Sequence, residues 1–201
     1  MDRDLVDREL ADRELAYREP RRRRLAGLLG LVGLVLILQG LWIPAKAQLA
    51  QVLLEVAWVR TAEGETARPW PWADTWPVAR LRAPAYGIDH VVLEGASGSV
   101  LAFAPGRDAS PEPGHTVLGG HRDTHFKFLK DMRVGDALEW VSKEGEVSEF
   151  RMTWAVIVDH RDTGVLESDG EALTLVTCRP FDAVVPGGPL RYVVRAEPVQ
   201  G

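Results

Sequence analysis

A cysteine, a histidine and an arginine lie where short apolar runs begin or end, and together these residue types can carry out acyl transfer. Cys178 is the only cysteine of the chain and closes the run at 173–177. His121 follows two glycines at the end of another run, and Arg191 opens the run at 192–194. A strand end holds a side chain on a rigid sheet and leaves it accessible. We therefore take these three residues as the candidate catalytic residues.

Their chemistry is complementary. A free thiol has a pKa of about 8.5 and is mostly protonated at neutral pH, so Cys178 needs a base nearby. The imidazole of His121 can act as this base, and it can also protonate a departing amine. Arg191 carries a permanent, planar cation suited to a carbonyl oxygen that gains charge. Taken singly, the cysteine could be core filler and the arginine a solvated charge, so the hypothesis depends on the combination.

These motifs resemble those of a known family. Thr-Leu-Val-Thr-Cys at 174–178 is similar to the Thr-Leu-x-Thr-Cys signature of sortases. Gly-His-Arg at 120–122 is similar to the segment around the sortase histidine, and Arg191 matches the sortase arginine. The order histidine, cysteine, arginine along the chain agrees as well.

Longer segments resemble the sortase class found in Gram-negative bacteria. They are Gly-Gly-His-Arg-Asp-Thr-His-Phe at 119–126, Cys-Arg-Pro-Phe-Asp-Ala at 178–183, and Pro-Ala-Lys-Ala-Gln-Leu-Ala at 44–50. Arg179 departs from this pattern, because an aromatic or small polar residue is expected directly after the cysteine. The resemblance covers residues from about 25 to 197.

The resemblance implies a transpeptidase that cuts a C-terminal sorting signal of the Leu-Pro-x-Thr-Gly type between Thr and Gly. Cys178 would form a thioester with the Thr carbonyl, and His121 would protonate the departing amine and activate the incoming one. Arg191 would steady the oxyanion, and Thr177 would contribute to substrate binding. Transfer to water instead of an amine would make the same site a peptidase. The expected partner is a protein with such a signal, the amine acceptor is left open, and no cofactor is expected.

Other arrangements of the histidines compete with this hypothesis. His-Arg-Asp-Thr at 160–163 repeats the motif that begins at His121, but only His121 is preceded by two glycines that permit close backbone approach. A zinc site could use His121 and His125 with the spacing of a helical pair, completed by His115 and Cys178. The glycines before His121 oppose a helix there, so no metal is expected.

A non-catalytic membrane-tethered β domain is the alternative from another class of protein. It requires Cys178 to be buried and remote from His121.

The elements that must position the site read as strands. Short apolar runs rich in β-branched residues are separated by Gly, Pro, Asp and Ser, which is typical of a sandwich or barrel. With the family resemblance, we expect a mainly β fold, a closed eight-stranded sortase-like barrel with short helices. The expected strands lie at 78–81, 90–93, 100–103, 116–118, 137–141, 150–158, 173–177 and 192–194.

An apolar segment at 25–43 is long enough to cross a membrane, since roughly 20 helical residues span about 30 Å. Arginines at 21–24 should remain cytoplasmic, which places the rest of the chain outside. A cleaved signal peptide is the alternative, because 43–47 holds an Ala-x-Ala pattern. For a Gram-negative sortase this means an inner-membrane anchor and a periplasmic domain. The formal net charge of −5 argues against nucleic-acid binding.

The remaining segments complete the expected organisation. Residues 1–24 read as a charged, largely disordered cytoplasmic tail, because their leucines form no helical stripe. Residues 44–77 read as an amphipathic stalk helix, followed by a stiff linker rich in Pro and Trp. The apolar face predicted for the stalk consists of Leu49, Val52, Leu53, Val56 and Val59, and it could lean on the domain or on the membrane surface. The catalytic barrel is expected at 78–201.

Overall fold

A computed structural model describes residues 3–109, 112–185 and 187–199, with side chains from Arg23 onward. The chain divides into two compact units, residues 1–48 and 49–201. One helix, α1 (Arg3–Ala62), supplies the first unit and continues into the second. Its apolar stretch reaches a mean hydropathy of 2.2, and it is long and apolar enough to cross a membrane.

The expected disorder of the charged tail is wrong, since α1 begins at Arg3. The tail is rich in Leu, Ala, Arg and Glu, which are strong helix formers. It also continues directly into the apolar segment, so no new helix nucleus is needed. Intrinsic propensity therefore outweighs the lack of an apolar stripe.

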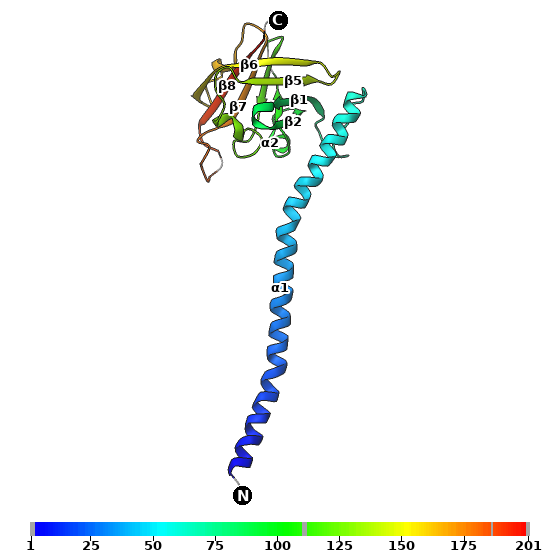
Figure 1. Ribbon diagram of the computed structural model, residues 1–201, viewed down its shortest axis with the longest axis vertical. Helices are drawn as coiled ribbons and strands as arrows, with labels where there is room; N and C mark the ends of the chain where they lie inside the picture. The colour runs from blue at the N-terminus through cyan, green and yellow to red at the C-terminus, as the bar shows by residue number, and fades with distance from the viewer. Residues whose placement is uncertain (1–2, 110–111, 186, 200–201) are drawn as a thin grey trace. The chain divides into compact units, whose positions relative to one another are not determined.

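The second unit holds a closed barrel of eight strands, as expected (Figure 1). Its strands are β1 (Pro77–Ala83), β2 (Ile88–Glu94), β3 (Gly106–Asp108), β4 (His115–Gly119), β5 (Ala137–Ser142), β6 (Val147–Asp159), β7 (Ala172–Cys178) and β8 (Leu190–Pro198). They are hydrogen-bonded in the order β1-β2-β3-β4-β7-β8-β6-β5. The pairs β2/β3 and β4/β7 are parallel, and the others are antiparallel.

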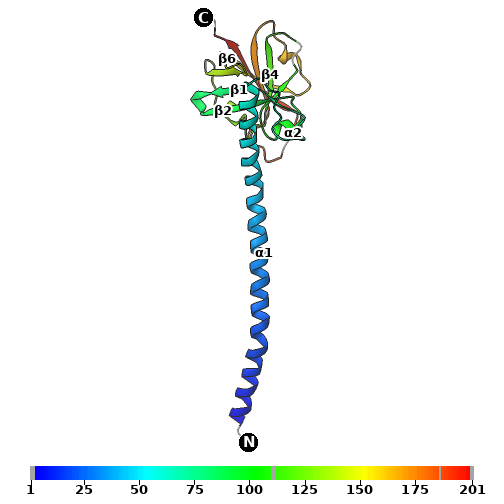
Figure 2. The same ribbon diagram turned by 90° about the vertical axis from the view of Figure 1, so that its right-hand side faces the viewer.

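The third predicted strand is wrong. Half of the run at 100–103 lies in the short helix α2 (Gly98–Leu101), which Figure 2 shows beside the barrel. The third strand is β3, whose residues carry no apolar pattern. A Cβ atom on Gly106 would clash with the carbonyl oxygen of Gly95, so β3 runs too close to its neighbour for a side chain there. A strand defined by close backbone approach leaves no hydrophobic signal.

Short 3-10 helices connect the strands: η1 (Pro84–Tyr86), η2 (Lys127–Lys130) and η3 (Gly164–Leu166). The main core fills the barrel with side chains from every long strand and from the segment around η2. On β7, Leu173 and Leu175 belong to this core. Because side chains alternate along a strand, Thr174, Val176 and Cys178 face the outside of the barrel.

The end of α1 packs on the barrel through a second apolar cluster. Leu54 and Trp58 of α1 meet side chains of β2 and α2 there, and the cluster consists of Leu54, Trp58, Val91, Leu93, Val100 and Ala104. Ala50 and Ala57 are also buried, and such small side chains allow the helix to approach closely. The barrel therefore contacts another face of the helix, because Leu49, Val52, Val56 and Val59 of the predicted apolar stripe are 52% to 59% exposed.

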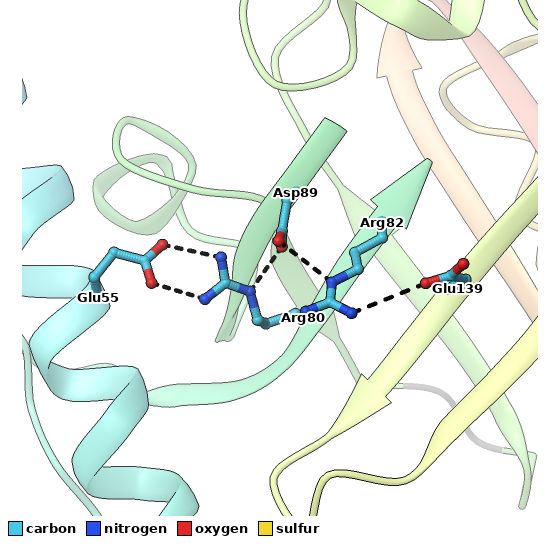
Figure 3. Close-up of polar contacts among 5 residues, drawn as sticks. All are labelled: Glu55, Arg80, Arg82, Asp89 and Glu139. Carbon is cyan, nitrogen blue, oxygen red and sulfur yellow. Dashed lines mark hydrogen bonds and ion pairs between the residues drawn. The ribbon is translucent and has the colours of Figure 1, made fainter. Parts of the chain in front are cut away.

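A chain of charged side chains reinforces this contact (Figure 3). Arg80 of β1 donates to Glu55 of α1 at 2.7 Å and to Asp89 of β2 at 2.7 Å. Arg82 then links Asp89 to Glu139 of β5, with nitrogen–oxygen distances of 3.3 and 4.0 Å. The stalk residues of α1 are thus fixed to the barrel by apolar and ionic contacts together.

The linker between α1 and β1 is irregular, as expected. The Trp70 ring packs edge-on against Phe103, with ring centroids 4.8 Å apart. Trp72 is 82% exposed. One tryptophan therefore anchors the linker, while another remains in solvent.

Candidate active site

Parallel pairing of β4 and β7 brings His121 beside Cys178. The register aligns Gly119 with Val176. Beyond the end of β4, the Gly120 N–H still donates to the Val176 carbonyl at 3.2 Å. Two residues beyond the aligned pair Gly119 and Val176, the segments reach His121 and Cys178. The histidine and the cysteine thus lie on adjacent segments at the same end of the barrel.

Antiparallel pairing of β7 and β8 places Arg191 directly opposite Cys178. The residues that flank this pair are hydrogen-bonded, since the Arg179 N–H donates to the Leu190 carbonyl at 3.0 Å. Cys178 and Arg191 themselves therefore form a non-hydrogen-bonded pair of the antiparallel ladder. In such pairs the Cβ atoms are only about 4.5 to 5.5 Å apart and the two side chains share one face. Arg191 donates from Nη1 to the carbonyls of Gly188 at 2.8 Å and Leu190 at 3.0 Å. Its guanidinium is thereby held toward the β7–β8 loop.

The exposure of the three side chains suits chemistry on a substrate from solvent. His121 is exposed, whereas Cys178 and Arg191 are half-buried. The non-catalytic alternative requires a buried cysteine far from His121, and the described residues show neither condition. The three residues thus lie on neighbouring segments, and each side chain is at least partly exposed.

Close packing against Phe126 requires a glycine at position 120, directly before His121. A Cβ atom there would lie 2.6 Å from the ring of Phe126, which is fully buried in the main core. The N–H of Phe126 in turn donates to the His121 carbonyl at 2.9 Å. The backbone of His121 is therefore fixed by a buried ring that only glycine allows to come so close.

Arg122 ties the His121 segment to the loop after Cys178, a role that sequence reasoning missed. Its side chain is buried, and Nη2 donates to the carbonyls of Ala183 at 3.0 Å and Val185 at 2.8 Å. Its Nη1 atom is buried without a hydrogen-bond partner. A charged residue directly after the candidate histidine was the only sequence signal for this function.

Thr177 lies inside the barrel and not at the substrate face. Its side chain is 2% exposed, and Oγ1 donates to the Gly120 carbonyl at 2.7 Å. The expected substrate contact is therefore not available to its hydroxyl group. Thr177 instead connects the cysteine strand to the histidine segment.

His125 and His90 contact each other, and His125 lies near His121. Their rings lie edge to face, with centroids 5.4 Å apart. Burial, together with the nearby His90 and His121 rings, lowers the pKa of His125 to about 4. Burial also lowers the pKa of His90, whose Nε2 atom has no hydrogen-bond partner. His125 is therefore neutral at neutral pH and adds no positive charge beside His121.

The competing histidines lie elsewhere. His160 follows β6, and its N–H donates to the Pro189 carbonyl at 2.6 Å, just before β8. Because β8 lies between β6 and β7 in the barrel, His160 is separated from the cysteine strand. His115 begins β4, at the opposite end from His121, and its Nε2 atom lies 2.8 Å from the Thr174 hydroxyl. Within the described ranges, no group of three or more His, Cys, Asp or Glu side chains could hold a metal ion.

Arg179, the departure from the expected motif, packs on aromatic rings. Its guanidinium carbon lies 5.8 Å from the Tyr192 ring centroid and 6.0 Å from that of Phe181. Phe181 and Tyr192 contact each other and the main core. A cation above two rings is a favourable arrangement, so this arginine stabilises the start of the β7–β8 loop.

A closed barrel with cysteine, histidine and arginine gathered at one end defines a sortase-like protein, and comparison with known proteins agrees. The profile of the sortase domain matches residues 81–199, which is more than half of the chain. The chain therefore belongs to the sortase family. It is 32% identical over 120 residues to Sortase D of Bacillus subtilis (strain 168), an alignment that covers 57% of this chain and 60% of that protein.

Solved structures support the fold. Sortase A from Corynebacterium diphtheriae superposes with a TM-score of 0.56 at 26% identity, covering 64% of this chain and 63% of that one. A Sortase D5 transpeptidase of Clostridium perfringens superposes with a TM-score of 0.54 at 22% identity, covering 73% and 89% of the two chains. The chain thus spans less than two thirds of the Bacillus and Corynebacterium proteins.

Proposed function

We propose that this chain is a membrane-anchored cysteine transpeptidase that cuts a C-terminal sorting signal of the Leu-Pro-x-Thr-Gly type between Thr and Gly. The observation that carries the proposal is the position of Cys178 between His121 and Arg191 on neighbouring segments. Membership of the sortase family supports the same reaction class.

The reaction begins when the Cys178 thiolate attacks the Thr carbonyl carbon and a tetrahedral oxyanion forms. Arg191 donates hydrogen bonds to that oxyanion, exchanging its loop carbonyl partners for the substrate. The carbon–nitrogen bond breaks as His121 protonates the departing Gly amine, leaving a thioester on Cys178. An incoming amine then loses a proton to His121, attacks the thioester and releases Cys178 as the thiolate, which restores the thiolate and imidazolium pair.

Thr177 and Arg122 position these groups. Thr177 joins the cysteine strand to the carbonyl of Gly120, and Arg122 joins the histidine segment to the loop that follows the cysteine. Neither residue needs to touch the substrate. Preorganisation of this kind lowers the cost of bringing the nucleophile, the proton donor and the cation together.

Sequence features support the proposed cell location and sortase class. The apolar part of α1 would span the inner membrane once, with the arginines at 21–24 in the cytoplasm and the barrel in the periplasm. The segments at 119–126 and 178–183 support the Gram-negative class of sortases. The protein substrate would carry the sorting signal, an apolar segment and basic residues at its C-terminus.

A peptide transfer assay tests the proposal. The full chain in micelles is incubated with a Leu-Pro-x-Thr-Gly peptide, with and without a Gly-containing amine, and the products are weighed by mass spectrometry. Transpeptidation predicts a ligated product when the amine is present. A cut peptide with no ligation at any amine concentration would instead assign the peptidase reaction, and an intact peptide would contradict the proposal.

A further inference from the structure

The stalk part of α1 carries an apolar stripe that the barrel leaves uncovered. The stripe consists of Leu49, Val52, Val56 and Val59, which are 59%, 59%, 52% and 54% exposed. A row of large aliphatic side chains on one helix face requires a partner surface, because isolated exposed apolar residues are ordinary but contiguous ones are not.

The spacing of the stripe identifies the kind of partner. These residues follow one another at alternating spacings of three and four, the a and d positions of a heptad repeat. Side chains at such positions interlock with the same positions on another helix. In sequence, the same spacing continues toward the N-terminus through Leu28, Leu31, Val35, Leu38, Trp42 and Ala45.

The barrel occupies a different face of the same helix. In this heptad register, Ala50 and Ala57 are at b positions, Leu54 is at f and Trp58 is at c, and these side chains are the buried ones. The contact with the barrel thus leaves the a and d positions free. A helix can pack on its own barrel and on a second helix at once.

Charges beside the stripe match a parallel copy of this chain. Glu55 is at a g position and Arg60 is at the e position of the next heptad. In parallel coiled coils a g side chain faces the following e side chain of the partner helix. Within their own chain, Glu55 pairs with Arg80 and Arg60 with Glu65, yet the Glu55 and Arg60 side chains remain 52% and 55% exposed. Both can therefore also reach across an interface.

We propose that the stalk helices of two or more copies of this chain associate in parallel through the a and d side chains at 49–59. The membrane anchor of the proposed function would hold the copies in one orientation and at one depth, which aligns the heptads and raises their effective concentration. A lipid surface fits less well, because helices that lie on membranes carry Trp or Phe on the apolar face and Lys or Arg around it. Here the face is one Leu and three Val, flanked by an acid and a base.

Site-directed crosslinking of the full chain in membrane vesicles tests this inference. Cys178→Ala removes the only native thiol, so a single new cysteine reports on the stalk. Val56→Cys places the thiol at an a position, and Gln51→Cys is the matched control at an exposed c position. Mild oxidation should give about tenfold more disulfide-linked dimer from the a position, because only there do Cα atoms of two chains come within bonding range.

A second variant separates loss of association from loss of folding. Val52→Asp with Val59→Asp, in the Val56→Cys protein, should abolish the dimer without changing the melting of the barrel by circular dichroism, because both valines are mostly exposed. Equal crosslinking at 51 and 56 would overturn the inference. Protection of the thiol at 56 from a water-soluble maleimide, without any dimer, would assign the stripe to lipid and overturn it as well. Neither outcome depends on transpeptidase activity, so failure here leaves the proposed function intact.

Discussion

Cys178 and Arg191 are direct cross-strand partners, one at the end of β7 and the other near the start of β8. They form a non-hydrogen-bonded pair, in which two side chains of adjacent strands come closest. The guanidinium of Arg191 donates to the Gly188 and Leu190 carbonyls, so it must leave these partners to bind a substrate carbonyl beside the thiol. The relationship leads to a specific prediction for Arg191.

Replacement of Arg191 should reduce catalysis and leave the fold intact. Arg191→Ala should lower kcat/KM by roughly 10²- to 10³-fold, the usual effect of removing one oxyanion donor. Arg191→Lys should rescue little, because an ammonium group lacks the planar, paired donors of guanidinium. Steady-state cleavage of the sorting peptide measures both. A fully active lysine variant would show that Arg191 supplies charge alone.

Gly120→Ala should destabilise the barrel, because the new Cβ atom would lie 2.6 Å from the Phe126 ring. Forcing apart a packed core costs about 1 to 3 kcal/mol. Gly119→Ala is the matched control, since its Cβ atom would lie 3.6 Å from Leu101, an ordinary contact. Urea unfolding of the two variants gives the comparison. Equal stability of both would disprove the packing explanation for the glycine before His121.

Arg122→Leu should release the β7–β8 loop, because it removes the hydrogen bonds to the Ala183 and Val185 carbonyls. The loss of buried, charge-assisted bonds predicts about 2 kcal/mol less stability. It also predicts faster amide hydrogen exchange in the loop and a higher KM. Arg133→Leu, at an exposed arginine in the turn before β5, serves as the control. If exchange in the loop stays slow in Arg122→Leu, the loop is held by other contacts.

Acid should destabilise the fold through His125. Its pKa is lowered to about 4 in the folded protein, against about 6.5 in the unfolded chain. The unfolded chain therefore binds more protons between these values, so stability is fully present above pH 6.5 and is lost as pH falls toward 4. Thermal unfolding between pH 4 and 8 should show a flatter acid limb in His125→Asn than in the native chain.

His160→Asn is the control for this experiment, because His160 is exposed at the end of β6. It should retain the acid limb of the native protein. An acid limb that is unchanged in His125→Asn would mean that other groups, not the partly buried His90 and His125 pair, cause the loss of stability.

The barrel could be predicted from strand patterning together with the family resemblance, and the three candidate residues that the motifs indicate lie on neighbouring segments at one end of it. The sequence did not reveal β3, since close backbone contact at Gly106 leaves no apolar pattern. It also left open what the apolar face of the stalk contacts, and the structure shows small residues such as Ala57 against the barrel while the larger valines remain exposed. Periodicity identifies an apolar face but not its partner.

The role of Thr177 could not be predicted for a related reason. Alternation places it inside the barrel, but the acceptor of its hydroxyl group, the Gly120 carbonyl, comes from a distant segment. The same holds for Arg122, whose partners lie in the β7–β8 loop. Contacts between segments far apart in the chain depend on the sheet order, which local patterns do not encode.

The most direct test of the account is the capture of the acyl-enzyme. The full chain is mixed with a Leu-Pro-x-Thr-Gly peptide, quenched in acid and weighed intact by mass spectrometry. The account predicts an adduct that ends in Thr, located on Cys178 after digestion, lost in Cys178→Ala and much reduced in His121→Asn, but retained in His160→Asn. Cleavage of the peptide at an unchanged rate by Cys178→Ala would contradict it.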